Sequence, residues 1–305
     1  MYFSHSMDSE CKQILVTWHE CKVECKVSLV GILMKSNNNE TEPVTPNLKL
    51  APVFYTLAQV QFNPIAQMSD YVAPLQERLR RSGFPDFRAE NQLEILFRRV
   101  EALQPDIQQQ QQMRWSFMDT QRTEGYLLFS NNLVFHTTNY NTFENFLEKT
   151  ISGLELIHEV VELAYIERIG LRYLDAIVPV EHDALSQYLN GSLLGLSETV
   201  EGHLRHSFTE TVTEIAESTL VTRAVISEGN LALPPDLFPL PLMLQPRFAD
   251  INGRHAVLDT DLSVTKRSNF DITTVESQLV KAYDITAGIF KNSVTDDARK
   301  KWGLI

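Results

Sequence analysis

Residues 113–138 read MRWSFMDTQRTEGYLLFSNNLVFHTT, and this stretch decides the fold class. Its first five residues alternate apolar and polar side chains, as expected for a strand with one buried face. Two more apolar runs, residues 126–129 and 133–138, are rich in the aromatic and β-branched residues that favour strands. They flank Asn131-Asn132, a pair that tolerates positive φ and predicts a hairpin turn. Successive strands joined by short turns predict an antiparallel sheet.

Alternation of apolar and polar residues predicts further strands on both sides of this stretch. The expected strands are residues 52–62, 165–178, 204–217, 219–227 and 254–266. Residues 86–112 have no clear period. We assign the glutamine run Gln108 to Gln112 within them to a polar edge or a loop.

The expected helices begin at residues whose side chains can accept a hydrogen bond from a free backbone N–H. The expected N-caps are Ser69, Asn141, Thr273 and Thr295. Glu144 and Glu276 stand three residues after the second and third of these caps, which predicts capping boxes. One more helix is expected over residues 183–194.

The expected strands cluster in hairpins and do not alternate regularly with helices. This order predicts an α+β fold of mostly antiparallel sheets with helices packed on them, and argues against a doubly wound fold. We expect two closely packed α+β halves, residues 47–180 and 181–305. Residues 1–46 are expected to form a disordered or spurious N-terminal extension.

Composition excludes several classes of function for the chain as a whole. The 305 residues carry a formal net charge of −12, which opposes broad attraction to nucleic acid or to anionic lipid. The 12 glycines form neither a dinucleotide-binding nor a P-loop motif. No apolar run approaches the length of a membrane span. We therefore expect no membrane partner and no cofactor, and the overall charge does not support a nucleic-acid partner.

All three cysteines, Cys11, Cys21 and Cys25, precede Met34. A body without cysteine has no disulfides and no thiolate nucleophile, which suits a reducing cytoplasm. The stretch before Met34 differs in character from the rest, so we expect Met34 to be the true start. His19 with Cys21 and Cys25 resembles half of a zinc site, but zinc spacing normally needs a second ligand pair. An unstructured tail is the preferred interpretation.

The strand over residues 254–266 carries a polar face. His255, Asp259 and Asp261 share that face because side chains alternate along a strand. Two carboxylates and an imidazole suit a metal-dependent hydrolase or nuclease. A solvent-facing stripe, or ion pairs with Arg223 or Arg254, would give the same pattern.

A second candidate site lies on the strand over residues 165–178. Arg168 and Arg172 share one face and flank Gly170, a residue that can mark a bulge or the close approach of another backbone. Two guanidinium groups can bind a carboxylate, a phosphate or a nucleotide. The competing interpretation is structural pairing with acids on neighbouring strands.

A loop at residues 231–246 holds five of the 13 prolines. Its leucines and its phenylalanine make it apolar, so we expect it to pack on the body. Leu237, Phe238 and Leu240 are the candidate partner-binding residues. Because no complete catalytic constellation stands out, the leading hypothesis is a non-enzymatic interaction or regulatory protein. It would act through a protein partner or by self-association.

Three features resemble a sporadically distributed family of uncharacterised prokaryotic proteins, about 250 residues long, the size of one or two domains. They are the proline-led strand at residues 51–62, the IGLRYL strand at residues 169–174, and the C-terminal pattern from Leu258-Asp259-Thr260-Asp261 to Trp302-Gly303. Asp175 stands where asparagine is more usual. The resemblance implies no assigned activity or cofactor. Its patchy distribution suggests a mobile or defence-related locus.

Overall fold

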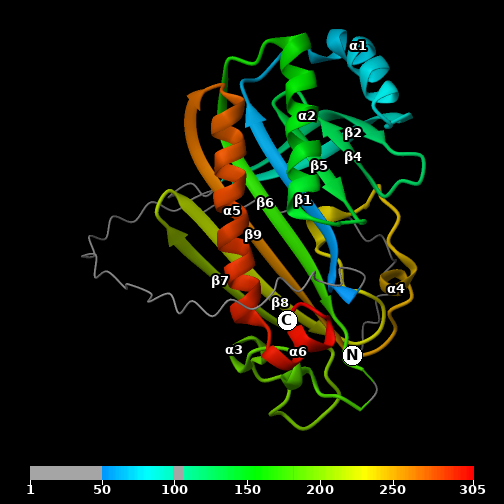
Figure 1. Ribbon diagram of the computed structural model, residues 1–305, viewed down its shortest axis with the longest axis vertical. Helices are drawn as coiled ribbons and strands as arrows, with labels where there is room; N and C mark the ends of the chain where they lie inside the picture. Colours follow the sequence, from blue (N-terminus) through cyan, green and yellow to red (C-terminus); the bar gives the residue numbers. More distant parts are fainter. Residues whose placement is uncertain (1–49, 99–105, 181) are drawn as a thin grey trace, which may run out of the picture.

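The computed structural model describes residues 50–98, 106–180 and 182–305. Nine strands form one sheet in the order β2-β3-β4-β5-β1-β6-β9-β8-β7, and every neighbouring pair is antiparallel (Figure 1). The strands are β1 Val53–Phe62, β2 Asp86–Arg98, β3 Asp106–Met118, β4 Glu124–Leu128, β5 Asn132–Thr137, β6 Tyr165–Ile177, β7 His206–Ile215, β8 Ser218–Ser227 and β9 His255–Asn269.

The helices of the described residues differ widely in length. The α-helices are α1 Met68–Arg81, α2 Phe143–Val161, α3 Gly191–Leu194, α4 Pro246–Ala249, α5 Ile272–Ser293 and α6 Asp296–Lys301, and two 3₁₀ turns are η2 Leu185–Gln187 and η3 Pro235–Leu237. No helix in this part of the chain is both long and apolar enough to cross a membrane.

One face of the sheet, which we call the helical face, packs against α1, α2 and α5. Each helix turns an apolar stripe toward the strands, as in Leu75 of α1, Leu154 of α2 and Leu279 of α5. The sheet contributes alternate residues, such as Ala58 and Leu171, because successive strand side chains point to opposite faces. This layer is the main hydrophobic core.

The other face, which we call the strap face, is crossed by residues 231–246, the strap. Leucines of the strap pack on Tyr55 of β1, Leu174 of β6 and Val257 of β9. The prediction that this proline-rich loop packs on the body is therefore confirmed. The next helix, α4, adds Phe248 to the same cluster.

The α+β class with antiparallel pairing and helices on the sheet is confirmed. Strands β6 and β9 come from the two expected halves, and they pair over most of their length. Both halves therefore contribute to a single sheet. The expected extension at residues 1–46 lies outside the described residues, as do Met34 and the three cysteines.

The hairpin predicted at Asn131-Asn132 is present, but its turn is shifted by one residue. Phe129 N–H donates to the carbonyl of Asn132 at 2.9 Å, so Ser130 and Asn131 form the tip. Neither asparagine has a positive φ. A neighbouring pair of residues can make the same connection, and the sequence does not distinguish them.

The loop alternative for the glutamine run and the helix expected over residues 183–194 are wrong. Residues 86–112 contain β2 and part of β3, and the glutamine run Gln108 to Gln112 lies within β3, where it pairs with β2. Residues 183–194 form η2 and α3 instead of one helix. There the chain turns to meet the end of α5, with Asn190 N–H donating to Ser293 O at 2.8 Å.

Three of the four predicted caps are also wrong, each by one or two residues. The N-cap of α1 is Gln67, that of α2 is Thr142 and that of α5 is Asp271. At the starts of α2 and α5 two cap-forming residues lie within two positions of each other, so their pattern does not choose between them. At the start of α1, Gln67 makes no side-chain cap hydrogen bond. The fourth prediction is confirmed, because Thr295 accepts a hydrogen bond from Ala298 N–H.

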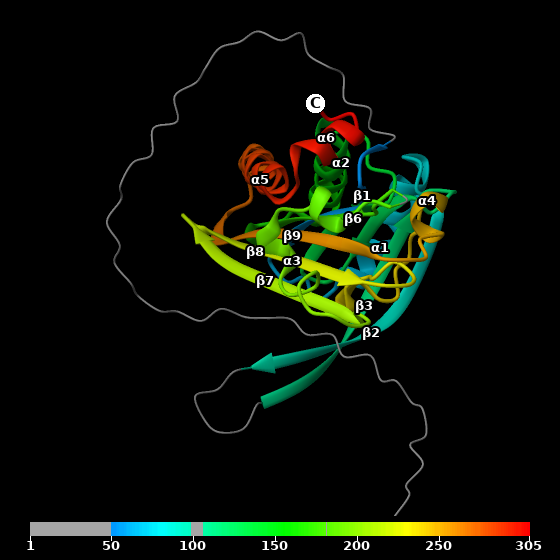
Figure 2. The same ribbon diagram turned by 90° about the horizontal axis from the view of Figure 1, so that it is seen from below.

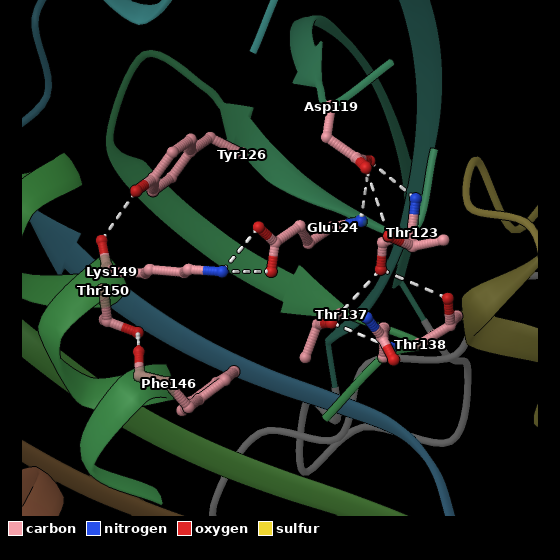
Figure 3. Close-up of polar contacts among 10 residues, drawn as sticks. Asp119, Thr123, Glu124, Tyr126, Thr137, Thr138, Phe146, Lys149 and Thr150 are labelled. Carbon is pink, nitrogen blue, oxygen red and sulfur yellow. Dashed lines mark hydrogen bonds and ion pairs between the residues drawn. The ribbon is translucent and has the colours of Figure 1, made fainter. Parts of the chain in front are cut away.

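Polar contacts fasten the β4–β5 hairpin to α2 (Figure 3). Lys149 of α2 forms an ion pair with Glu124 of β4 at 2.6 Å, and the Tyr126 hydroxyl donates to the Lys149 carbonyl at 2.6 Å. Before the hairpin, Asp119 accepts hydrogen bonds from the backbone of Thr123 and Glu124. These contacts hold the ring of Tyr126 against the helix.

Gly153 of α2 lies directly against the ring of Tyr126. A Cβ atom at Gly153 would lie 2.2 Å from Cε1 of Tyr126. We expect Gly153→Ala to lower the free energy of unfolding by about 1–3 kcal/mol, because the ring must move in a packed core. Gly288 of α5 has no atom within 4 Å of its added Cβ, so Gly288→Ala should stabilise by about 0.5–1 kcal/mol. Urea unfolding of both variants checks this, and a shift of the same sign in both would contradict it.

Candidate functional site

A row of charged side chains crosses the strap face, and we call it the charged belt: Glu210 of β7, Arg223 of β8, Asp259 of β9, Arg172 of β6 and Asp236 of the strap. The strand register brings it together. Arg223 lies opposite Asp259, and Arg172 lies opposite Asp261 in the same strand β9. Strand alternation places these side chains on one face, as the sequence predicts.

Arg172 is the centre of the belt. Its Nε donates to Asp259 Oδ1 at 2.7 Å and its Nη2 donates to Asp259 Oδ2 at 2.8 Å, a bidentate pair. Its Nη1 donates to Asp236. Arg172 is 6% exposed and Asp259 is 1% exposed, so both charges are removed from water. Burial opposes the charged form, but the bonds to Asp259 and Asp236 keep the pKa of Arg172 well above its usual value.

Arg223 extends the belt to the edge of the sheet. Its Nη1 donates to Asp259 Oδ2 at 3.2 Å, and its Nε donates to Glu210 Oε2 at 2.7 Å. Asp259 thus accepts from two arginines. Among the interpretations left open by the sequence, the structure shows ion pairing of Asp259 with Arg223. Arg254 has another partner, since it donates to the carbonyl of Ser197.

Asp261 and Arg168 lie next to the belt. Burial raises the pKa of Asp261, while the nearby charges of Arg172 and Arg168 oppose that shift. Arg168 donates to the side-chain oxygen of Gln59. A Cβ atom at Gly170 would lie 3.1 Å from Nη1 of Arg168, so this glycine makes room for a guanidinium and not for another backbone.

The two arginines therefore differ in what they can bind. The Arg172 guanidinium is held by Asp259 and Asp236, as the structural interpretation expects. Arg168 has an amide as its partner. An anion binding to both residues would have to displace two carboxylates from Arg172.

The structure does not bring His255 together with the two aspartates. His255 is fully buried, and both of its ring nitrogens meet backbone groups: Nε2 accepts from Ala232 N–H at 3.1 Å, and Nδ1 is 2.9 Å from Gly253 O. It lies four residues from Asp259 on an extended strand, about 13 Å along the chain. Across residues 50–98, 106–180 and 182–305, no three His, Cys, Asp or Glu side chains are grouped to hold a metal.

A second buried polar group on the strap face was missed by the sequence analysis. His136 of β5 lies opposite Leu57 of β1 and is 2.9 Å from the Tyr55 hydroxyl. Burial, with a smaller contribution from Arg114, lowers the pKa of His136 to about 3. In the sequence, the sign of this buried group was His136 itself, a polar residue that follows three apolar ones in the strand expected at residues 133–138. That signal identifies a buried histidine but not its partner.

The strap carries the third set of predicted residues. Leu237 and Leu240 are partly buried against the body, whereas Phe238 is 41% exposed. Met243, further along the strap, is 62% exposed. The structure thus divides the three predicted residues into two anchors and one exposed aromatic side chain.

Contacts along its length fix the strap. Near its start, Ala232 N–H donates to His255. In its middle, Asp236 pairs with Arg172. Near its end, Met243 N–H donates to the carbonyl of Arg122 at 2.7 Å, and the hydroxyl of Thr138 donates to the carbonyl of Met243 at 2.7 Å. The backbone that carries Phe238 and Met243 is therefore held on both sides.

No protein-family model and no curated protein matches the chain. The resemblance of residues 51–62, 169–174 and 258–303 to a prokaryotic family stays a prediction.

Proposed function

We propose that this protein is a non-enzymatic binding protein whose strap docks a protein partner. The observation that carries the proposal is the state of the strap: its backbone is anchored, while Phe238 and Met243 face solvent. Aromatic and methionine side chains are enriched in protein interfaces. A loop that is already ordered loses less conformational entropy when it binds.

The charged belt supports this proposal in a different way. Its two arginines are bonded to three carboxylates, so its polar groups are engaged with one another. Asp236 belongs both to the belt and to the strap. Through the ion pair between Asp236 and Arg172, the belt holds the strap on the sheet.

The test uses the exposed residue and not the anchors. Leu237 and Leu240 pack on the body, so changing them mixes loss of binding with loss of strap structure. Phe238→Asp places a charge where the partner would bury an aromatic ring, which is expected to cost several kcal/mol of binding, as at interface hot spots. We expect immobilised wild-type protein to capture a partner from a lysate of its native host that Phe238→Asp does not capture.

The control is Leu196→Asp, because Leu196 is a large apolar residue that is 71% exposed and lies outside the strap. It should capture the same partner as the wild type. Identical capture by all three proteins would contradict docking on the strap. Far-UV circular dichroism and thermal unfolding confirm that the variants are folded.

A further inference from the structure

Strand β7 ends the sheet and has β8 as its one neighbour among the strands of the described residues. Figure 2 shows β7 as the outermost strand of the sheet on that side. Its ten residues, HSFTETVTEI, pair with β8 in an unbroken register from His206 to Ile215. An edge strand of this length presents backbone N–H and C=O groups to a further strand.

β7 lacks several of the devices that prevent edge pairing, although it carries Glu210 and Glu214. Natural edge strands are protected by lysine, proline, bulges or short length. β7 contains no lysine and no proline, and no register shift interrupts its pairing with β8. Three threonines give it a high preference for extended structure.

The strap-face side of β7 also exposes apolar side chains. Phe208 is 57% exposed and Val212 is 58% exposed. Between them lies Glu210, whose carboxylate is bonded to Arg223 at 2.7 Å. The strand thus places one uncovered apolar residue on each side of an acid that is paired with Arg223.

We propose that a second copy of this chain pairs with β7 edge to edge, antiparallel, across a two-fold axis at Glu210. The argument for a second copy is the pattern of β7 itself. With Glu210 on the axis, Phe208 lies opposite Val212 of the other copy, and this pair occurs twice. His206 lies opposite Glu214 in the same way, which places an imidazole N–H donor beside a carboxylate.

The opposite side of the strand fits the same register. There Thr209 lies opposite Thr211 of the other copy, and hydroxyl pairs of this kind stabilise antiparallel strands. The two Glu210 carboxylates meet at the axis, each with its own Arg223. Moving the axis to Thr211 would place Phe208 opposite Glu214, and Glu210 opposite Val212. The pattern therefore favours one register.

This interface does not depend on the strap, so the two proposals fail separately. We expect sedimentation velocity on the full chain to show a monomer–dimer equilibrium that shifts toward dimer with protein concentration. Phe208→Glu should raise the dimer dissociation constant about tenfold or more, because the change occurs twice in the interface. Val280→Glu, at an exposed apolar residue of α5, is the matched control and should leave the constant unchanged.

A charge exchange tests the register. His206→Glu should weaken the dimer, because it places two carboxylates opposite each other. The double variant His206→Glu/Glu214→Lys should restore it, because each pair becomes an ion pair. A monomer at all concentrations would overturn the proposal, and so would a dimer that ignores Phe208→Glu or is not restored by the double variant. Capture of a different protein on β7 by a monomeric chain would also overturn it.

Discussion

Replacing Arg172 by methionine is expected to lower the free energy of unfolding by about 3–5 kcal/mol. The arginine neutralises Asp259, which is 1% exposed, and also pairs with Asp236 of the strap. Without it, one arginine at 3.2 Å is left to compensate the Asp259 carboxylate. A buried charge that loses its bidentate partner is among the most costly changes in a protein interior. Urea unfolding at neutral pH measures the effect.

Two further variants test whether the unpaired Asp259 carboxylate causes the loss of stability in Arg172→Met. Arg172→Met/Asp259→Leu removes both charges and should recover most of the loss, since apolar residues can replace a buried ion pair at little cost. Arg81→Met removes an exposed arginine, 73% accessible, that pairs with Glu77, and should change stability by less than about 1 kcal/mol. If the double variant were no more stable than Arg172→Met, the loss would come from packing and not from the unpaired carboxylate.

The second large effect concerns Asp175 on the helical face. This residue is 5% exposed. It lies two residues after Tyr173, whose hydroxyl is 3.4 Å from that of Tyr140. Burial raises the pKa of Asp175 to about 8. The folded protein therefore holds this group as the neutral acid at neutral pH.

The sign of the pH dependence follows from this shift. An unfolded aspartate has a pKa near 3.8, so the two states differ in protonation between about pH 4 and pH 8. The stability contributed by the neutral Asp175 is fully present below about pH 4 and is lost as pH rises through 8. Each pH unit in that window costs about 1.4 kcal/mol.

His136 has the opposite dependence. Its pKa falls from 6.5 to about 3 on folding, so its contribution is present above pH 6.5 and is lost as pH falls through 3. Between about pH 4 and 6.5 the slopes of the two residues cancel. Between pH 6.5 and 8 the slope from Asp175 remains. Stability is therefore expected to fall on the alkaline side.

Asp175→Asn should remove that alkaline loss. The amide has the shape of the neutral acid but does not ionise, so the variant should be more stable than the wild type by several kcal/mol at pH 8. Near pH 4 the two proteins should be similar. Urea unfolding at both pH values is the measurement, with Asp284→Asn on the exposed side of α5 as the control. A variant less stable than the wild type at pH 8 would show that the carboxylate has a favourable partner.

The sequence predicted most of the elements, because alternation and helical spacing are local properties. The strands over residues 165–178 and 254–266 were expected within a few residues of β6 and β9. Residues 86–112 were missed because β2 and β3 extend as a hairpin whose glutamines have no apolar period. The helix expected over residues 183–194 fails because Asn190 pairs with the end of α5, a contact 103 residues away (Asn190 to Ser293).

The candidate site was predicted residue by residue but not as a site. Asp259, Arg172 and Arg223 each appeared in the sequence analysis, with ion pairing among the alternatives. Asp236 did not appear, because a strap residue meets β6 only after the loop packs on the sheet. His136 did not stand out for a similar reason. Its partner, Tyr55, lies 81 residues earlier in the chain.

The sequence by itself determined the α+β class, the antiparallel pairing and which side chains of each strand share a face. These follow from the two-residue period of strands and the 3.6-residue period of helices, which act between neighbours in the chain. Only the tertiary structure decided that Arg172 binds Asp259 and Asp236, that Phe238 faces solvent while Leu237 is partly covered, and that β7 is an edge. These contacts depend on the order of the strands and on how the strap packs. Both bring together residues that are far apart in the chain, and the sequence pattern does not show which of these are close in space.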